Sequence, residues 1–232
     1  MSRMANLCRS AEHVYHTEGL ASLIGRGFRF LAYCFAEYRV YYVYVDSLED
    51  IGRLNEAEFR PRVAGVSFKV VSSNGEADEL EAQGLEFRSC GSDAREWLEN
   101  GAIACCVFVG RELGNVVWVA TNQRAQHIIG EPPYRVDYSN NETCAGGLWT
   151  NPKYRRMRLR TYNRLERFRY LRAQEVTTVR GVIARRNTVA YAGRVKLGFL
   201  PCAEGRYVRL LWWESWKEKP LSPSKGDCSH QS

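Results

Sequence analysis

The stretch Gly147-Leu148-Trp149-Thr150-Asn151-Pro152-Lys153-Tyr154-Arg155-Arg156 decides the fold of this chain. An apolar run ends at an Asn-Pro turn and continues into an arginine-rich segment, a pattern typical of a strand that feeds directly into a helix. Further along, Asn187-Thr188-Val189-Ala190 predicts a helix cap, and Leu197-Gly198-Phe199 predicts the turn that ends that helix. A helix entered abruptly from a strand presents unpaired backbone N–H groups, which suits it to bind a pyrophosphate.

This order of strand, Pro-x-Tyr-Arg turn, helix, strand, Asn-x-x-Ala helix and Leu-Gly-Phe turn resembles the GNAT superfamily of acyl-CoA-dependent N-acyltransferases. The resemblance covers residues 40–215, and its motifs occupy 147–161 and 187–199. The family motif at the turn is Arg/Gln-x-x-Gly-x-Gly/Ala. Here Arg155 fills the first position, while Arg158 and Arg160 stand where glycines are expected. Arginines crowd the approach that glycines leave open, but they offer bidentate donors for phosphate.

Composition and pattern predict one globular core. With 232 residues, 45% of them hydrophobic, the chain is long enough to bury it. The expected fold is α/β (α+β): a single GNAT-like domain over residues 39–217, with a central mixed, mostly antiparallel sheet flanked by helices. Residues 1–38 are expected to form an N-terminal amphipathic helical extension, and 218–232 a disordered tail. No apolar run is long enough to span a bilayer and no signal peptide is recognisable, so we expect a cytoplasmic protein.

Local patterns place the individual elements. Strands are expected over residues 39–45, 63–69, 103–109, 115–121, 143–150, 176–183 and 207–213, with 135–138 continuing the sheet. Helices are expected over residues 76–82, 93–100, 156–174 and around Ala190.

The helix expected at 156–174 is unusual for its arginines, of which eight lie between Arg155 and Arg172. At 100° per residue, one face of the helix would carry Arg156, Arg160, Arg164 and Arg167. The neighbouring apolar stripe would comprise Met157, Leu165, Phe168 and Leu171 and pack on the sheet. We expect the arginine face to be solvated and the functional part to be confined to 155–161.

The resemblance implies transfer of an acetyl or other acyl group from acyl-CoA to an amine by direct attack on the thioester. It places the carbonyl and the pantetheine against backbone groups of Leu148, Trp149 and Thr150, beside a splayed neighbouring strand. The other cofactor-binding residues that it implies are Arg155, Arg156, Met157, Arg158, Leu159, Arg160, Thr161 and Asn187.

An incoming ammonium needs a base within hydrogen-bond reach. Glu142 is the candidate, because its even spacing from Leu148 places it on the same face of the strand; Asp137 is the alternative. In the family a tyrosine often protonates the departing thiolate. Arg194 stands at that position here, so Tyr191, one helical turn earlier, becomes the candidate acid. Each of these residues also fits an ordinary surface or packing role.

The net charge of +7 favours an anionic partner without choosing among cofactor, membrane and nucleic acid. A second hypothesis is therefore a catalytically degenerate GNAT-fold binding module, whose basic surface contacts anionic membrane or nucleic acid. For the enzyme, nucleic acid is not expected as a partner. Residues 10–35 mix aromatic and basic side chains, as in a helix at a membrane surface or one packed on its own domain. No motif identifies the acceptor, a small molecule or a surface amine.

The eight cysteines include no CxxC pair and no histidine at ligand spacing. We therefore expect no metal site. Cys105 and Cys106 lie in an apolar strand pattern, where a reduced cysteine is a small buried hydrophobe, and a structural role is expected for all eight.

Overall fold

The computed structural model describes residues 36–90 and 93–221. The expected N-terminal extension and most of the expected tail lie outside these ranges. Residues 36–38, assigned to the extension from the sequence, begin a strand instead, and the last strand runs to Pro220, past residue 218 where the tail was expected to start. Among the described residues, no helix combines the length and the apolar composition needed to cross a membrane.

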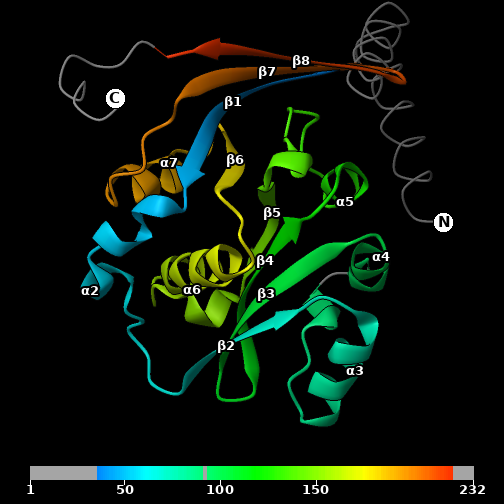
Figure 1. Ribbon diagram of the computed structural model, residues 1–232. Coiled ribbons are helices and arrows are strands. Elements are labelled where there is room, and N and C mark those ends of the chain that lie inside the picture. Colours follow the sequence, from blue (N-terminus) through cyan, green and yellow to red (C-terminus); the bar gives the residue numbers. More distant parts are fainter. Residues whose placement is uncertain (1–35, 91–92, 222–232) are drawn as a thin grey trace, which may run out of the picture. The chain divides into compact units, whose positions relative to one another are not determined.

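One sheet organises the fold (Figure 1). Its strands are β1 (Ala36–Ser47), β2 (Val66–Val71), β3 (Ala102–Val109), β4 (Glu112–Ala120), β5 (Glu142–Thr150), β6 (Thr178–Ala184), β7 (Ala203–Leu210) and β8 (Trp213–Pro220). They lie in the order β2-β3-β4-β5-β6-β1-β7-β8. The pairs from β2 to β5 and the pair of β6 with β1 are antiparallel, whereas β5 and β6 are parallel. The mixed, mostly antiparallel sheet that the sequence predicts is confirmed.

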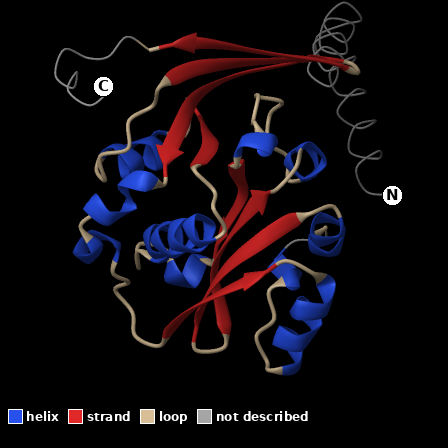
Figure 2. Ribbon diagram, viewed as in Figure 1, coloured by secondary structure: helices blue, strands red, loops and turns tan. Residues whose placement is uncertain are grey.

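Helices pack against the sheet (Figure 2). They are α2 (Glu56–Phe59), α3 (Asn74–Ala82), α4 (Ala94–Glu99), α5 (Gln123–Ile128), α6 (Leu159–Ala173) and α7 (Thr188–Val195). Four 3-10 helices are η1 (Glu49–Arg53), η2 (Arg88–Cys90), η3 (Tyr138–Asn140) and η4 (Pro152–Tyr154). As predicted, Asn187 caps α7 by accepting a hydrogen bond from the N–H of Ala190, and Gly198 follows the helix with φ of 81°.

Two hydrophobic clusters lie on opposite faces of the sheet. One joins β3 and β4 to α3, α4 and α5, and the other joins the same strands to η1, α2 and α6. Neighbouring residues of β3 alternate between them: Cys106 packs in the first cluster and Cys105 in the second. Successive side chains of β3 therefore point to opposite faces of the sheet, as expected of a strand that is covered on both faces.

Residues 135–138, predicted as a strand, form an irregular segment that ends in η3. Two prolines at 132 and 133 lack the N–H groups that a strand would donate. The buried side chain of Gln126 donates to the carbonyl groups of Pro132 and Tyr134, each at 2.9 Å. A side chain therefore satisfies the backbone groups that would otherwise pair with a neighbouring strand.

The chain divides into two compact units. The larger contains the described residues from 40 to 205 and from 216 onward, and every site discussed below lies within it. Of the smaller unit, the structure describes residues 36–39 and 206–215. Within the smaller unit, Arg209 pairs with Glu37 at 2.9 Å and Tyr207 donates to Glu214 at 3.0 Å.

Candidate active site

The parallel strands β5 and β6 separate soon after they meet. Their register includes only three residue pairs, from Glu142 with Thr178 to Cys144 with Arg180. Beyond this point a cleft of about 280 Å³ opens between Ala145–Leu148 of β5 and Gly181–Ala184 of β6. This is the splayed pair of strands that the family resemblance implies. Because both strands turn unpaired backbone toward the opening, it is suited to hold an extended ligand by backbone hydrogen bonds.

A bulge in β5 faces this cleft. Gly147 and Leu148 together stand opposite the single residue Val117 of β4, so one residue is left out of the ladder. Gly147 has φ of 54°, a left-handed conformation that favours glycine, and a β-carbon there would come within 2.9 Å of Trp118. The bulge therefore depends on glycine, and it places the backbone of Gly147 and Leu148 along the cleft.

The turn after β5 has left-handed backbone at two arginines. Arg156 and Arg158 have φ of 67° and 61°, and Arg158 is the N-cap residue of α6. No side chain caps this end of the helix. Three N–H groups of the first turn, from Leu159 to Thr161, consequently have no carbonyl acceptor inside the helix. The arginine at position 158 thus occupies the conformation that a glycine would adopt most easily.

The arginines further along α6 do not form the solvated face that the sequence predicts. Arg164 and Arg167 are buried at 7% and 6% exposure, Arg160 is half-buried, and all three line the cleft. The apolar stripe is confirmed for Leu165, Phe168 and Leu171, whereas Met157 precedes the helix and is exposed. Helical periodicity alone does not distinguish a face that meets solvent from one that meets a polar cavity.

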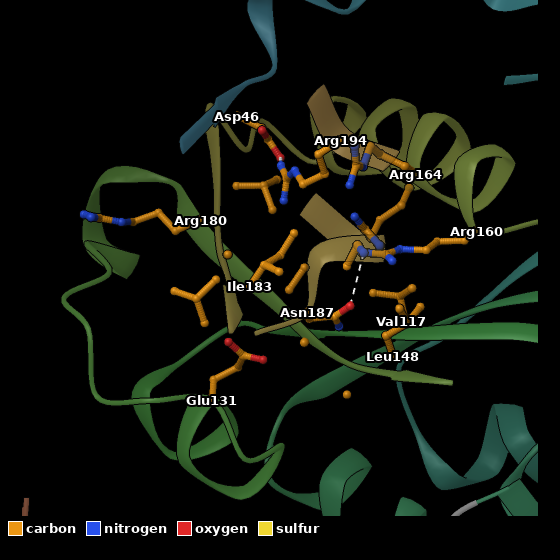
Figure 3. Close-up of a pocket in the computed structure, with 18 of the residues that line it drawn as sticks. Asp46, Val117, Glu131, Leu148, Arg160, Arg164, Arg180, Ile183, Asn187 and Arg194 are labelled. Atoms are coloured by element: carbon orange, nitrogen blue, oxygen red, sulfur yellow. Dashed lines mark hydrogen bonds and ion pairs between the residues drawn. The ribbon is translucent and has the colours of Figure 1, made fainter. Parts of the chain in front are cut away.

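Arg194 of α7 joins this group from the opposite wall. It is buried and pairs with Asp46 of β1, which is buried as well. In Figure 3 the guanidinium groups of Arg160, Arg164 and Arg194 gather at one side of the cleft, while Arg180 points away from them. Burial and mutual repulsion lower the pKa of Arg160 to about 10 and lower the pKa of Arg164 and Arg167.

Glu131, which sequence reasoning missed, lies at the other end of the cleft (Figure 3). It follows α5, and its carboxyl group sits over Gly146 of β5, where a β-carbon would overlap it. Burial raises the pKa of Glu131 to about 7, although a hydrogen bond from the hydroxyl of Tyr134 at 3.2 Å opposes the rise. A carboxyl group with a pKa near neutrality is suited to accept a proton during catalysis.

Glu131 also borders a second cavity, of about 360 Å³. Its wall is formed by the segment after α5 and by α5 itself, including Gln126, His127 and Tyr138. The hydroxyl of Tyr138 donates to Gln126 at 3.0 Å, and Gln126 in turn holds the segment around Pro132. The carboxyl group of Glu131 is therefore shared between the cleft and a cavity large enough for a small molecule.

Of the cofactor-binding residues expected from the sequence, three line the cleft: Leu148, Arg160 and Asn187. Trp149 packs in the core, and Thr150 accepts a hydrogen bond from Asn115 at 2.9 Å. Arg155, Arg156 and Met157 are exposed in the turn, Arg158 reaches the carbonyl groups of Ala57 and Glu58, Leu159 is buried, and Thr161 borders a neighbouring pocket.

The expected base and acid lie away from the cleft lining. Glu142 accepts a hydrogen bond from the backbone N–H of Asp137 at 2.9 Å, so its carboxylate holds the turn before β5 together. The ring of Tyr191 stacks on that of Tyr42, with centroids 4.8 Å apart. A signal for Glu131 does exist in the sequence, because paired glycines inside a strand, here Gly146 and Gly147, mark the close approach of another group.

Three of the described cysteines fit the structural role expected of them, whereas Cys90 is half-buried and Cys202 is exposed. Cys105, Cys106 and Cys144 are fully buried, and burial raises the pKa of each thiol. A thiol held protonated is a poor nucleophile and a poor ligand. Within residues 36–90 and 93–221, no three His, Cys, Asp or Glu side chains gather as a metal ion would require.

Comparison with solved structures finds GNAT-fold proteins. A tandem GNAT protein from the clavulanic acid biosynthesis pathway is 17% identical, with a TM-score of 0.44, over 84% of this chain and 60% of that one. A GCN5-related N-acetyltransferase from Kribbella flavida is 16% identical, with a TM-score of 0.44, over 83% and 64%. A conserved protein of unknown function from Staphylococcus epidermidis is 14% identical, with a TM-score of 0.48, over 82% and 66%.

The chain thus spans less than two thirds of each of these structures. No family model matches the sequence, and no curated protein matches it. The chain resembles GNAT-fold proteins in the arrangement of its strands and helices, as its motifs indicate.

Proposed function

We propose that this protein transfers an acyl group from acyl-CoA to an amine. The observation that carries the proposal is the cleft between β5 and β6, which has cationic groups at one end and the carboxyl group of Glu131 at the other. The phosphates and the reactive carbonyl of an acyl-CoA thioester lie at opposite ends of the molecule. The phosphates would lie at the cationic end of the cleft and the carbonyl near Glu131. A second cavity at Glu131 supplies a place for the acceptor.

The residues present fit such a donor. The uncapped first turn of α6 offers backbone N–H groups and the positive end of the helix dipole to a pyrophosphate. The exposed strand edges on either side of the cleft would hold a pantetheine by backbone hydrogen bonds. Gly181 keeps the passage open, because a β-carbon there would meet the carbonyl oxygen of Ala145 at 3.5 Å and Nη1 of Arg194 at 3.9 Å.

In this proposal Glu131 is the general base. It accepts a proton from the acceptor's ammonium group, and the free amine then attacks the thioester carbonyl. The developing oxyanion is stabilised by a backbone N–H of the bulge at Gly147–Leu148. When the tetrahedral intermediate collapses, the carbon–sulfur bond breaks and the thiolate leaves. The former amine nitrogen loses its second proton to solvent and Glu131 returns its proton to that thiolate, so the amide, free CoA, ionised Glu131 and one proton in solvent remain.

Glu131 is a better base than Glu142 or Asp137 for two reasons. It borders both cavities, whereas the carboxyl group of Glu142 is engaged by the N–H of Asp137. Its pKa of about 7 also leaves it ionised in a useful fraction of molecules while it remains basic enough to take a proton. The proposal therefore replaces the base expected from sequence spacing.

The burial of Arg164 and Arg167 disfavours the alternative of a binding module. A basic helix that binds a membrane or nucleic acid presents its charges to solvent, and these two side chains are not available for that contact. Of the exposed cations of the turn, Lys153 pairs with Glu112, and the remaining Arg155 and Arg156 are too few to form such a surface alone.

Isothermal titration of acetyl-CoA and of a longer acyl-CoA tests donor binding. Gly181→Leu should fill the cleft and abolish binding, whereas Gly75→Leu, on the exposed side of α3, should leave it unchanged. Arg155→Ala should weaken binding if the turn contacts the donor. Release of CoA thiol with a panel of primary amines then tests transfer. Absence of acyl-CoA binding to the folded wild-type protein would overturn the proposal.

A further inference from the structure

The inner part of the cleft holds far more positive than negative charge. Four guanidinium groups line it, those of Arg160, Arg164, Arg167 and Arg194. Facing them, Asp46 is the one carboxylate among the described residues at this end of the cleft, since Glu131 lies at the other. The pairing of Asp46 with Arg194 leaves the other three arginines without an ion-pair partner among the described residues.

Several donors of these arginines are unused. Nη1 of Arg164, Nε of Arg167 and Nε of Arg194 are buried and have no hydrogen-bond partner in the part of the chain that the structure describes. Apart from the ion pair of Arg194 with Asp46, the contacts of these arginines are weak or uncharged. Arg164 lies over the ring of Phe199 at 4.7 Å, Arg194 lies over that of Tyr44 at 3.9 Å, and Nη1 of Arg167 is 3.4 Å from Asn163 Oδ1.

A purely structural role does not account for this arrangement. Burying an ionised group without a partner is expensive, and a hydrophobic residue of similar volume usually stabilises a core better. Two of the three arginines of α6 in the group are as buried as core leucines, yet no described carboxylate pairs with them. Burial, and to a lesser degree repulsion from neighbouring arginines, lowers the pKa of each, and a bound anion would oppose this decrease.

We propose that Arg160, Arg164, Arg167 and Arg194 form a phosphate-binding site inside the cleft, separate from the uncapped N-terminus of α6. Planar guanidinium groups bind phosphate oxygens in pairs, and an excess of three positive charges favours a dianionic phosphate over a single carboxylate. The phosphate is either a free ion or part of a larger donor. The site stands whether or not the protein transfers acyl groups.

The cleft is large enough for such a group. Its volume of about 280 Å³ is many times the roughly 10–15 Å³ that one water molecule requires. Gly181 of β6 lines the cleft near Arg194 and adds no side chain to it.

The test compares Arg164→Met with Arg172→Met, an exposed arginine on the same helix. Inorganic phosphate, pyrophosphate and CoA are titrated separately into each protein, and melting temperatures are recorded. In the wild type, at least one of these probes should bind, and Arg164→Met should weaken it by about 10- to 100-fold. Arg172→Met should bind as the wild type does. Binding of the inorganic ions assigns the site to a free phosphate, and binding of CoA alone assigns it to a donor.

A second readout separates a ligand site from a structural one. Without ligand, Arg164→Met should melt about 3 °C higher than the wild type, because it removes an uncompensated buried charge. A structural arginine would give the opposite sign. If Arg164→Met does not fold, Arg160→Gln at the half-buried edge of the cleft replaces it, with the same expected loss of binding.

The proposal is overturned if none of the three probes binds, or if Arg164→Met or its substitute binds them as tightly as the wild type does. Its failure is distinguishable from that of the acyltransferase proposal. Binding of pyrophosphate without binding of acyl-CoA supports the phosphate site alone. Binding of acyl-CoA that Arg164→Met leaves unchanged supports the acyltransferase alone.

Discussion

The carboxyl group of Glu131 occupies the space above Gly146 in which any other residue would place its β-carbon. A loop residue is thus seated directly on the backbone of β5, beside the point at which β5 and β6 part. The contact fixes a titratable group at the mouth of the cleft without any ion pair. It also explains why the strand tolerates two consecutive glycines, which otherwise weaken a sheet.

Gly146→Ala should displace Glu131 and close the cleft at its catalytic end. A β-carbon at 146 overlaps the carboxyl group, so either the loop after α5 or the strand must shift. We expect a loss of acyl transfer of at least about tenfold, with destabilisation of roughly 1–3 kcal/mol. Activity assays and chemical denaturation measure the two effects. Gly75→Ala, which meets only Ser73 Oγ at 3.9 Å, is the control and should leave both unchanged.

Glu131→Gln should remove the base while keeping the shape of the side chain. If Glu131 accepts the ammonium proton, kcat should fall by about 10²- to 10⁴-fold with little change in acyl-CoA affinity. The wild-type kcat/KM should rise with pH through about 7, the pKa of Glu131, and the variant should lack this step. Glu142→Gln is the matched control. A larger loss in that variant would restore the base chosen from sequence spacing.

The same carboxyl group makes stability depend on pH. Its pKa of about 7 in the folded protein exceeds the ordinary 4.5, so the folded state holds this proton more tightly than the unfolded state does. The resulting stabilisation is present below about pH 4.5 and is lost as pH rises to about 7. The free energy of unfolding should therefore fall across this window by no more than about 3.5 kcal/mol, since one pKa unit corresponds to about 1.4 kcal/mol. In Glu131→Gln this decrease should vanish. Denaturation at a series of pH values measures it, and an equal decrease in the variant would contradict the assignment.

The sequence predicts the sheet better than it predicts the site. The β3–β4 hairpin, β5, β6 and the Asn187 cap follow from local patterns of alternation, turns and capping, which depend on nearby residues. Residues 135–138 do not form the predicted strand, because the side chain of Gln126 donates to the backbone carbonyl groups of Pro132 and Tyr134 beside them. Such long-range contacts produce no periodic pattern in the amino-acid sequence.

The lining of the cleft could not be predicted from the sequence for a related reason. Spacing along β5 favoured Glu142 as the base, but it cannot show that the N–H of Asp137 engages this carboxyl group. Likewise, the arginines of α6 repeat at helical spacing whether they face solvent or a cavity. Only the approach of α7, with Arg194, and of β1, with Asp46, creates the enclosed charged wall.

Arg158→Gly should stabilise the protein. Arg158 has φ of 61°, which costs about 1 kcal/mol more for arginine than for glycine. Two long hydrogen bonds to the carbonyl groups of Ala57 and Glu58, each 3.4 Å, recover only part of that. Arg155→Gly, in an extended conformation at φ of −60°, is the matched control and should destabilise instead, because glycine there only adds freedom to the unfolded chain. Thermal denaturation of both variants measures the sign, and stabilisation by both would contradict the role of the left-handed backbone.

Asp46→Asn alone should destabilise the protein more than replacement of both Asp46 and Arg194. Asp46 is the carboxylate that faces the buried arginines, and without it Arg194 is left with an uncompensated charge. Breaking a buried pair from one side costs about 3–5 kcal/mol, whereas replacing both partners by uncharged groups is often neutral. The double variant Asp46→Asn with Arg194→Met should therefore regain most of the stability that Asp46→Asn loses. Urea denaturation of the wild type, both single variants and the double variant gives the coupling energy. If the stability losses of the two single variants simply add in the double variant, the pair does not balance the charge of the cleft. A missing ligand would then not explain the excess positive charge.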